Sequence, residues 1–270
     1  MPVDTAPHPH AQPDERPAPV RLLDAGDAAF TIEFGDTVEP ALVARVQALD
    51  SAIARCRHDG ALHGLIETMP TFRSLTVFFD PLLTSRAALI RELEPLFDAP
   101  APPGQATARQ WELPACYDVE MAPDLLETAQ ALRLAPEAVV EHHSRTVFTV
   151  YMLGFMPGFP FMGDLPAALH RPRRTEPRVR VPAGSVSIAL GLTAIYPWES
   201  PGGWHLIARC PARLFDATRP SPALLAPGDR VRFKPVDAVE FRRLDEAVRG
   251  GELDGAQWQT LMPREALLHG

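Results

Sequence analysis

The chain has 270 residues, enough for one large domain or two ordinary ones. Its formal charge of −8 argues against a nucleic-acid partner, because binding along the chain would need a basic face. Its 30 prolines are about twice the average share, so most of them must lie outside helix interiors and central strands.

The cysteines and the apolar runs narrow the class of protein further. Three cysteines, an odd number without a CxxC pair, predict neither a disulfide framework nor a zinc site, and we expect no metal. They favour a reducing compartment, so we expect a cytoplasmic protein. No segment approaches the ~20 apolar residues of a membrane helix, so we expect no membrane partner. Residues 1–19 hold six prolines and almost no large apolar side chain, which predicts a disordered tail.

Residues 20–97 alternate between strand-like and helix-like patterns. Apolar runs around a turn predict a hairpin, and apolar residues at steps of three and four predict helices. The expected elements are a hairpin over 20–34, a helix over 38–57, strands over 62–68 and 74–79, and a helix from 84 or 85 to 97. This β-β-α-β-β-α order predicts a sheet with helices on one side, in a ferredoxin-like α+β domain.

A proline-rich segment over 98–104 is typical of a linker and predicts a second domain over 105–250, with a C-terminal extension over 251–270. The expected elements are strands over 110–117 and 146–153, helices over 123–133, 136–144 and 236–249, and short strands over 186–190, 193–196, 204–209 and 230–233. Thirteen prolines fall between Pro157 and Pro235, and short strands punctuated in this way predict a β-barrel or sandwich.

The first motif with possible chemistry runs from Tyr151 to Gly163. It leaves a predicted strand and enters a turn-rich loop that contains Phe155, Pro157 and Phe159. These residues could form the rigid apolar wall of a pocket, together with Trp204. They could equally be the packed corner of a barrel, since apolar residues are usually core.

The second motif is an arginine-rich segment over 171–180, with a local charge of +4 in an acidic chain. Guanidinium forks recognise carboxylates and phosphates, so Arg173, Arg174 and Arg178 are candidate anion-binding residues. The alternative is a solvated loop, as most charge runs are. In the next turn, Ser185 is either a ligand contact or a residue that bonds its own backbone.

A third candidate region runs from Ile195 to His205. Ser200 precedes Gly202 and Gly203, whose N–H groups could form an anion nest. A serine and a histidine in one segment invite a nucleophile–base interpretation, yet His205 could simply alternate along a strand, and no acid partner is identifiable. The chain has neither a Walker A motif nor a GxGxxG motif, so it predicts no ATP site of its own.

Three phrases in fixed order and spacing resemble the KipI / allophanate hydrolase subunit 1 family. They are GFMPGFPFMGDLP over 154–166, PRRTEPRVRVPAGSVSIA over 172–189, and IYPWESPGGWHLIAR over 195–209. The resemblance extends loosely over residues 20–250. It departs from the family pattern at Asp164, where a second glycine is common, and at residues 207–210, where a glycine and a threonine are usual.

The resemblance implies a ferredoxin-like N-terminal domain followed by a cyclophilin-like β-barrel. It also implies a B-type component of a hetero-oligomeric enzyme. Its partners would be a KipA-like C-type component and an A-type component, and the complex would open 5-oxoproline, a small lactam, to L-glutamate. ATP and Mg²⁺ would act in the complex. Within such a site we expect His205 to shuttle a proton, because the pKa of histidine can lie near working pH.

Two other functions are compatible with these residues. A KipI-like protein would instead bind and inhibit a sensor histidine kinase through its barrel, and genes for the partner components beside this one would favour the enzyme. A weaker alternative is a free-standing barrel that binds a carbohydrate or a peptide.

Overall fold

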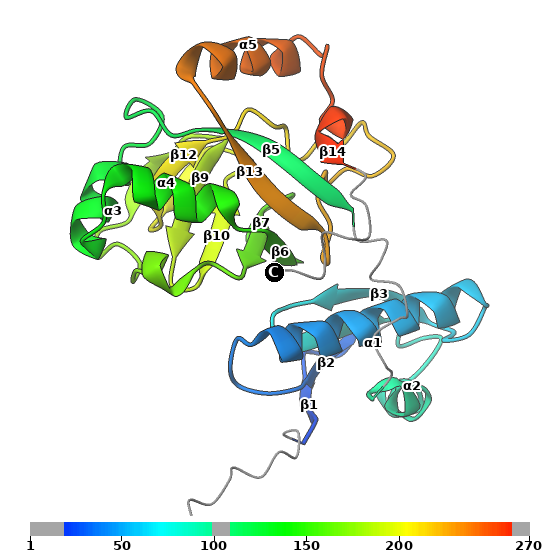
Figure 1. Ribbon diagram of the computed structural model, residues 1–270. Helices are drawn as coiled ribbons and strands as arrows, with labels where there is room; N and C mark the ends of the chain where they lie inside the picture. The colour runs from blue at the N-terminus through cyan, green and yellow to red at the C-terminus, as the bar shows by residue number, and fades with distance from the viewer. Residues whose placement is uncertain (1–18, 99–108, 261–270) are drawn as a thin grey trace, which may run out of the picture.

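The computed structural model describes residues 19–98 and 109–260, which form two bodies (Figure 1). The expected tail over 1–19 and linker over 98–104 lie almost entirely outside the described residues. The expected domain boundaries therefore stay predictions.

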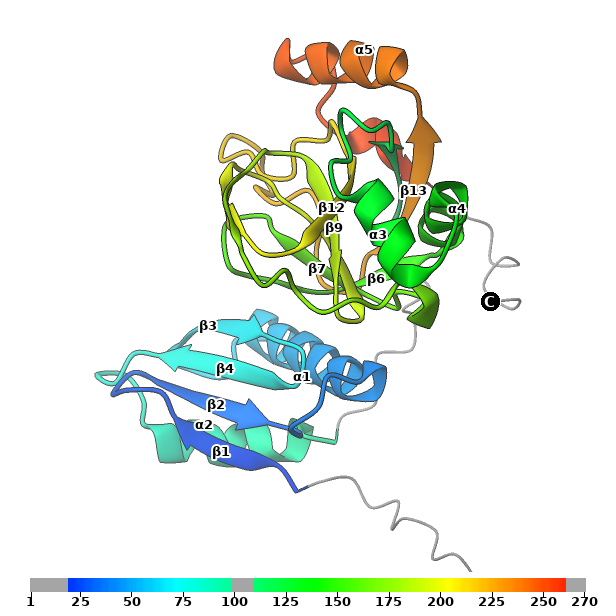
Figure 2. The ribbon, with the colours of Figure 1, turned by 90° about the vertical axis from the view of Figure 1, so that its left-hand side faces the viewer.

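The N-terminal body is a four-stranded antiparallel sheet with two helices on one face. Its elements are β1 (Arg21–Asp24), β2 (Ala29–Glu33), α1 (Pro40–His58), β3 (Leu65–Pro70), β4 (Ser74–Phe79) and α2 (Arg86–Leu93), followed by a short 3₁₀ turn, Glu94–Leu96. The strand order is β1-β2-β4-β3, with β3 nearest the second body (Figure 2). The predicted element order is confirmed; the ferredoxin-like assignment stays a prediction.

Periodicity explains why these segments adopt this arrangement. Val46, Leu49 and Ile53 of α1 recur at helical spacing and join one apolar cluster with Leu89 of α2 and alternate residues of β2 and β4. Of the two expected starting residues, 84 and 85, it is Ser85 that caps α2, because its Oγ accepts a hydrogen bond from the backbone N–H of Ala88 at 3.2 Å.

The second body is a closed barrel of seven strands, in the order β12-β9-β10-β7-β6-β13-β5, with β5 pairing back to β12. Its elements are β5 (Gln110–Cys116), α3 (Leu125–Leu132), α4 (Pro136–Arg145), β6 (Phe148–Leu153), β7 (Pro160–Gly163), β8 (Arg178–Val181), β9 (Ser185–Ala189), β10 (Leu192–Ile195), β11 (Ser200–Gly202), β12 (His205–Arg209), β13 (Arg230–Val236), α5 (Ala238–Arg249) and β14 (Gln259–Thr260). The predicted barrel is thus confirmed, while its cyclophilin-like character stays a prediction.

The structure contains four strands that the sequence did not predict, namely β7, β8, β11 and β14. The first three contain or adjoin proline or arginine residues, which are typical of loops. Pro160 begins β7, and Pro201 lies within β11. Proline has no backbone N–H, and it is tolerated in β11 because this strand pairs on one side only, with β8. The expected C-terminal extension begins at residue 251, yet Gln259 and Thr260 pair with β5 as β14.

A buried polar chain crosses the barrel core. The Thr193 hydroxyl donates to the Ser187 carbonyl at 2.9 Å, so it must accept from Nε2 of His143 at 3.0 Å. Nδ1 of His143 is then an acceptor, and the Tyr117 hydroxyl donates to it at 2.8 Å. Every polar atom of the imidazole is satisfied in this neutral tautomer, and burial lowers the pKa of His143 to about 3. This histidine is therefore a structural core residue.

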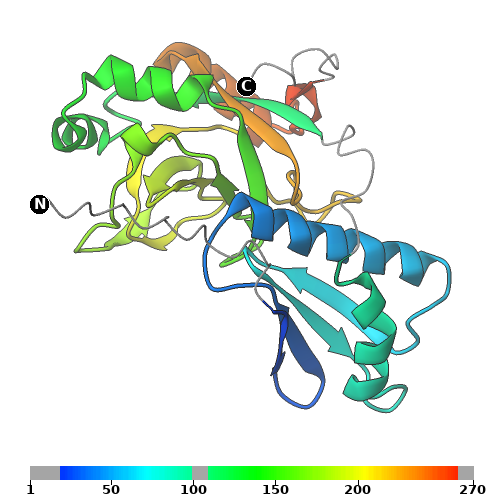
Figure 3. The ribbon, with the colours of Figure 1, turned by 60° about the horizontal axis from the view of Figure 1, so that its bottom comes forward.

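The two bodies contact each other through α1 and through the turn between β3 and β4. Gln47 of α1 donates to the carbonyl oxygens of Val150 and Tyr151 at 3.4 and 3.5 Å. The Phe72 ring lies edge-on against Tyr151 and Phe161, at centroid distances of 6.3 and 5.6 Å. Figure 3 shows α1 alongside the barrel. In the described ranges, no helix has the length and apolar character needed to cross a membrane.

Lowering the pH should destabilise the fold through His143. Its pKa is lower in the folded chain than the ~6.5 of an unfolded histidine, so the unfolded state takes up the proton first as the pH falls. From pH 7.5 to pH 5 the expected loss is about 2 kcal/mol, measured by urea unfolding. His143→Gln, whose amide can replace both hydrogen bonds, should flatten the decline, whereas His142→Gln at the exposed neighbouring position should not. An equal pH dependence in His143→Gln and the unsubstituted chain would contradict this.

Candidate functional site

Two of the sequence motifs lie side by side in the structure. Strand β8, from the arginine-rich segment, pairs antiparallel with β11, with Val181 opposite Ser200 and Arg178 opposite Gly202. The backbone N–H of Arg174 also donates to the carbonyl of Gly203 at 2.8 Å. We call β8, β11 and the segment 171–177 that leads into β8 the ribbon. It brings the candidate anion-binding arginines next to the candidate glycine turn.

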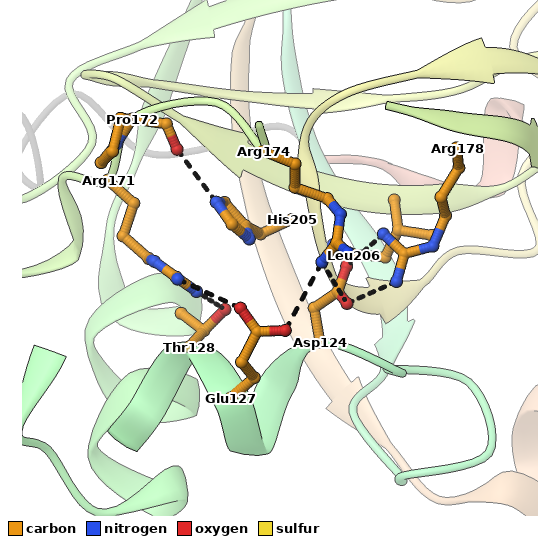
Figure 4. Close-up of polar contacts among 9 residues, drawn as sticks. All are labelled: Asp124, Glu127, Thr128, Arg171, Pro172, Arg174, Arg178, His205 and Leu206. Carbon is orange, nitrogen blue, oxygen red and sulfur yellow. Dashed lines mark hydrogen bonds and ion pairs between the residues drawn. The ribbon is translucent and has the colours of Figure 1, made fainter. Parts of the chain in front are cut away.

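The ribbon is fastened to the barrel by a buried carboxylate that the sequence interpretation missed. Asp124, at the start of α3, has only 2% of its surface exposed. Its two oxygens accept from both terminal nitrogens of Arg178, at 2.5 and 2.8 Å, and one of them accepts from Nη1 of Arg174 at 3.2 Å (Figure 4). The backbone N–H of Leu206 donates to the same carboxylate at 2.7 Å. One side chain therefore joins α3, the ribbon and β12.

The position of Asp124 in the sequence points to a different role. An aspartate just before a helix usually accepts a hydrogen bond from the first turn. Asp124 does occupy the N-cap position of α3, but its side chain makes no capping bond. The residue type and position predict a capping hydrogen bond, but the carboxylate binds the two arginines instead.

A second carboxylate on α3 strengthens the attachment. Arg171 donates to the Thr128 hydroxyl at 2.8 Å and to Oε1 of Glu127 at 3.2 Å. Arg174 donates to Oε2 of the same Glu127 at 3.4 Å. Arg171, Arg174 and Arg178 are thus all paired with α3, and only Arg173 of the four has no carboxylate partner within residues 19–98 and 109–260.

His205 is buried and holds the backbone of the ribbon. Its Nε2 lies 2.9 Å from the carbonyl oxygen of Pro172, so Nε2 carries the hydrogen. Nδ1 is buried and has no hydrogen-bond partner in the described part of the chain. Burial lowers the pKa of His205, with a smaller contribution from the charge of Arg171, so the ring is neutral at physiological pH. Its expected role in proton transfer stays a prediction.

The remaining residues of the third region have local contacts. The Ser200 hydroxyl donates to the carbonyl of Pro201 at 3.2 Å, and no bond joins it to His205 in the ranges described. Gly202 lies against the Tyr196 hydroxyl so closely that a Cβ atom would come within 2.3 Å of it. Glycine is therefore required at position 202 by packing, apart from any role in an anion nest.

The expected pocket wall divides into separate parts. Phe159 and Trp204 belong to one buried aromatic cluster beneath the ribbon, with ring centroids 6.4 Å apart. Phe155 is 68% exposed and has a positive φ of 68°, and Pro157 beside it is also exposed. Phe155 and Phe159 still touch edge-on, at 5.5 Å.

Two predicted site residues lie outside the ribbon. The Tyr151 hydroxyl donates to Asp164 at 2.9 Å, and its ring packs on Phe72 of the N-terminal body. Ser185 is buried at the other end of β9, paired with Arg209 of β12, whereas His205 pairs with Ile188. Within the described residues, no group of three histidine, cysteine or acidic side chains could hold a metal ion.

Comparisons with known proteins place the chain in a family. Residues 20–225 match a family model described as carboxyltransferase domain, subdomain C and D. The chain is 36% identical over 236 residues to the B subunit of 5-oxoprolinase from Bacillus subtilis, covering 84% of this chain and 97% of that protein. It is 41% identical over 177 residues to the protein of the same name from Haemophilus influenzae, covering 66% and 82% respectively. The chain belongs to the carboxyltransferase-domain family that includes these 5-oxoprolinase subunits.

Solved structures of relatives share the architecture. The crystal structure of TTHA0988 aligns with a TM-score of 0.68 at 38% identity, covering 78% of this chain and 40% of that longer one. The K. lactis urea amidolyase aligns with a TM-score of 0.68 at 21% identity, covering 87% of this chain and 16% of that one, which shows a common fold.

The structure explains how Asp164, the residue that departs from the expected pattern over 154–166, is accommodated. Asp164 adopts a positive φ of 69°, a conformation that glycine reaches freely and aspartate tolerates. Its carboxylate accepts from the Thr149 hydroxyl at 2.6 Å and from Tyr151. Aspartate therefore fits a position where the resemblance led us to expect glycine, and its side chain makes two hydrogen bonds there.

Removing the buried charge at position 124 should destabilise the chain strongly. In Asp124→Asn, Arg178 loses its carboxylate partner and Arg174 keeps only Glu127, although their side chains are only 25% and 24% exposed. The expected loss of unfolding free energy is about 3 kcal/mol, measured by urea denaturation.

The matched control is Glu127→Gln. The Glu127 side chain is 56% exposed, so its pairs with Arg171 and Arg174 should contribute no more than about 1 kcal/mol. Equal losses in the two variants would show that Asp124 does not anchor the ribbon.

Proposed function

We propose that the chain is the B subunit of an ATP-dependent 5-oxoprolinase, which opens 5-oxoproline to L-glutamate. The observation that carries the proposal is the 36% sequence identity to the B subunit of 5-oxoprolinase from Bacillus subtilis, over nearly the whole length of that protein. A third relative of the same name, from Escherichia coli O157:H7, is 50% identical over 124 residues. Both the name and the extent of the matches favour a component of an enzyme over a kinase regulator.

The name of these relatives implies partner subunits in a complex. We infer that the partners are an A-type component and a KipA-like C-type component, as the sequence resemblance implies. In TTHA0988 the matched region is only 40% of the chain, so a related unit is there joined to further polypeptide, which supports an assembly of several parts. The catalytic site of the complex would then use residues of more than one chain.

The chemistry of the reaction agrees with a cationic edge on this protein. An amide resists attack by water because of its resonance, and ATP can remove that resonance by phosphorylating the amide oxygen. Such a site must hold a substrate carboxylate close to a developing negative charge, and preorganised arginine forks and backbone N–H groups stabilise both. The ribbon, where Arg173 has no carboxylate partner among the described residues and lies near Gly202 and Gly203, is the part of this chain that supplies those groups. ATP and Mg²⁺ belong to the complex in this proposal.

The decisive experiment is reconstitution with the two partner components. Co-expressed with them, the chain should support release of glutamate from 5-oxoproline that depends on ATP and Mg²⁺, with one ADP per glutamate. Leaving this chain out should abolish the release, because the complex would lack the ribbon. Glutamate is measured by a coupled dehydrogenase assay and ADP by chromatography.

Two outcomes would overturn the proposal. One is 5-oxoproline-dependent ATP hydrolysis by the purified chain alone, which would exclude its assignment to a multi-chain enzyme. The other is full activity of the two partner components without this chain, combined with specific capture of a sensor histidine kinase, which would favour the regulatory function.

A further inference from the structure

We propose that Arg173 is the residue of the ribbon that binds the substrate carboxylate, and that Arg171, Arg174 and Arg178 instead hold the ribbon in place. The inference rests on the proposed function for the identity of the substrate. It divides a set of arginines that look equivalent in the sequence into one ligand-binding residue and three positioning residues.

The first support is the pairing of each guanidinium. Arg178 is bound by both of its terminal nitrogens to the buried Asp124, and Arg174 shares that carboxylate. Arg171 is bound to Glu127 and Thr128. A ligand that took any of these three would have to displace a buried or neighbouring carboxylate. Arg173 is exposed and has no such partner among the described residues, so its fork is available.

The second support is that the backbone is held on both sides of Arg173. The preceding residue, Pro172, is held by His205, whose Nε2 donates to its carbonyl at 2.9 Å. The following residue, Arg174, donates its backbone N–H to Gly203 at 2.8 Å. A side chain on a fixed backbone loses less conformational freedom when it binds a ligand, which favours affinity.

The third support is the surface on which the guanidinium rests. Its central carbon lies 5.9 Å from the centroid of the Trp204 ring, within the range of a cation–π contact. Trp204 is 5% exposed and is packed edge-on against Phe159 and Phe161. A planar guanidinium on an aromatic face keeps its N–H edge free for a carboxylate.

The local charge favours a monoanion over a nucleotide. Of the five arginines over 171–180, Arg180 is balanced by Glu199, and the other four are balanced in part by Asp124, Glu127 and Glu176. One net positive charge remains at this edge. It matches a single carboxylate, whereas the triphosphate of ATP, a polyanion, would need more cations.

The test compares kinetics of the reconstituted complex with Arg173→Ala and Arg173→Lys. In Arg173→Ala we expect KM for 5-oxoproline to rise at least tenfold, KM for ATP to stay unchanged, and the unfolding midpoint of the chain to stay unchanged because the side chain is exposed. Arg173→Lys, which keeps the charge and loses the fork, should give an intermediate KM. The control is Arg180→Ala, since Arg180 is also exposed on the ribbon and pairs with the exposed Glu199; its KM should not change.

A second measurement isolates the carboxylate from the lactam ring. The probe is 2-pyrrolidinone, which has the ring of 5-oxoproline without the carboxylate, used as a competitive inhibitor. Its inhibition constant should be the same in the unsubstituted complex and in Arg173→Ala. The affinity for 5-oxoproline, by contrast, should be lower in Arg173→Ala than in the unsubstituted complex. An equal loss for both ligands would show a general disturbance of the site and would overturn the assignment.

The remaining outcomes separate the two proposals. Turnover by the unsubstituted complex with an unchanged KM in Arg173→Ala overturns the inference and leaves the proposed function intact. A rise in KM for ATP instead of 5-oxoproline would assign Arg173 to the nucleotide and overturn the inference as well. Absence of any turnover by the unsubstituted complex overturns the proposed function and, with it, the identity of the carboxylate.

Discussion

The buried carboxylate of Asp124 is the interaction on which the candidate site depends. A carboxylate removed from water is destabilised by several kcal/mol unless its charge and its lone pairs are matched. Here two guanidinium groups supply the counter-charge, and the N–H of Leu206 supplies a further hydrogen bond. Because the donors come from different segments, satisfying one side chain fixes the relative positions of α3, the ribbon and β12.

The position of the ribbon in turn decides what its residues can do. With Arg174 and Arg178 committed to Asp124, their charges serve the architecture, and the exposed Arg173 is left to face solvent. His205 acts in the same way, because its one hydrogen bond goes to the backbone of Pro172 and burial keeps it neutral. Arginine and histidine are residue types that often bind ligands or catalyse reactions. The contacts that these residues make here are nevertheless structural.

The barrel provides the rigid support that this arrangement needs. Its closure through β5 and β12 leaves no free edge in the seven-stranded circuit, and the polar chain of Tyr117, His143 and Thr193 is fully satisfied inside it. The N-terminal body contacts this barrel through Gln47 and Phe72, and Phe72 packs on Phe161, whose ring also lies against Trp204. Family membership and architecture thus agree, and the candidate anion-binding residues are concentrated at one edge of the barrel.

Local sequence determined much of this protein. Periodicity, caps and turns predicted the order of the N-terminal elements and the presence of a barrel, and three motif phrases predicted the family, because these properties depend on neighbouring residues. The short strands β7, β8 and β11 were missed, since their prolines and arginines are stable as strands only when a partner strand is present. Only the tertiary structure decided which arginines are free: Asp124 lies 54 residues from Arg178 and 82 from Leu206, and no local pattern encodes a pairing over that distance. The physical reason is that the choice between a helix cap and a buried ion pair for the same aspartate depends on which charges the fold brings to it.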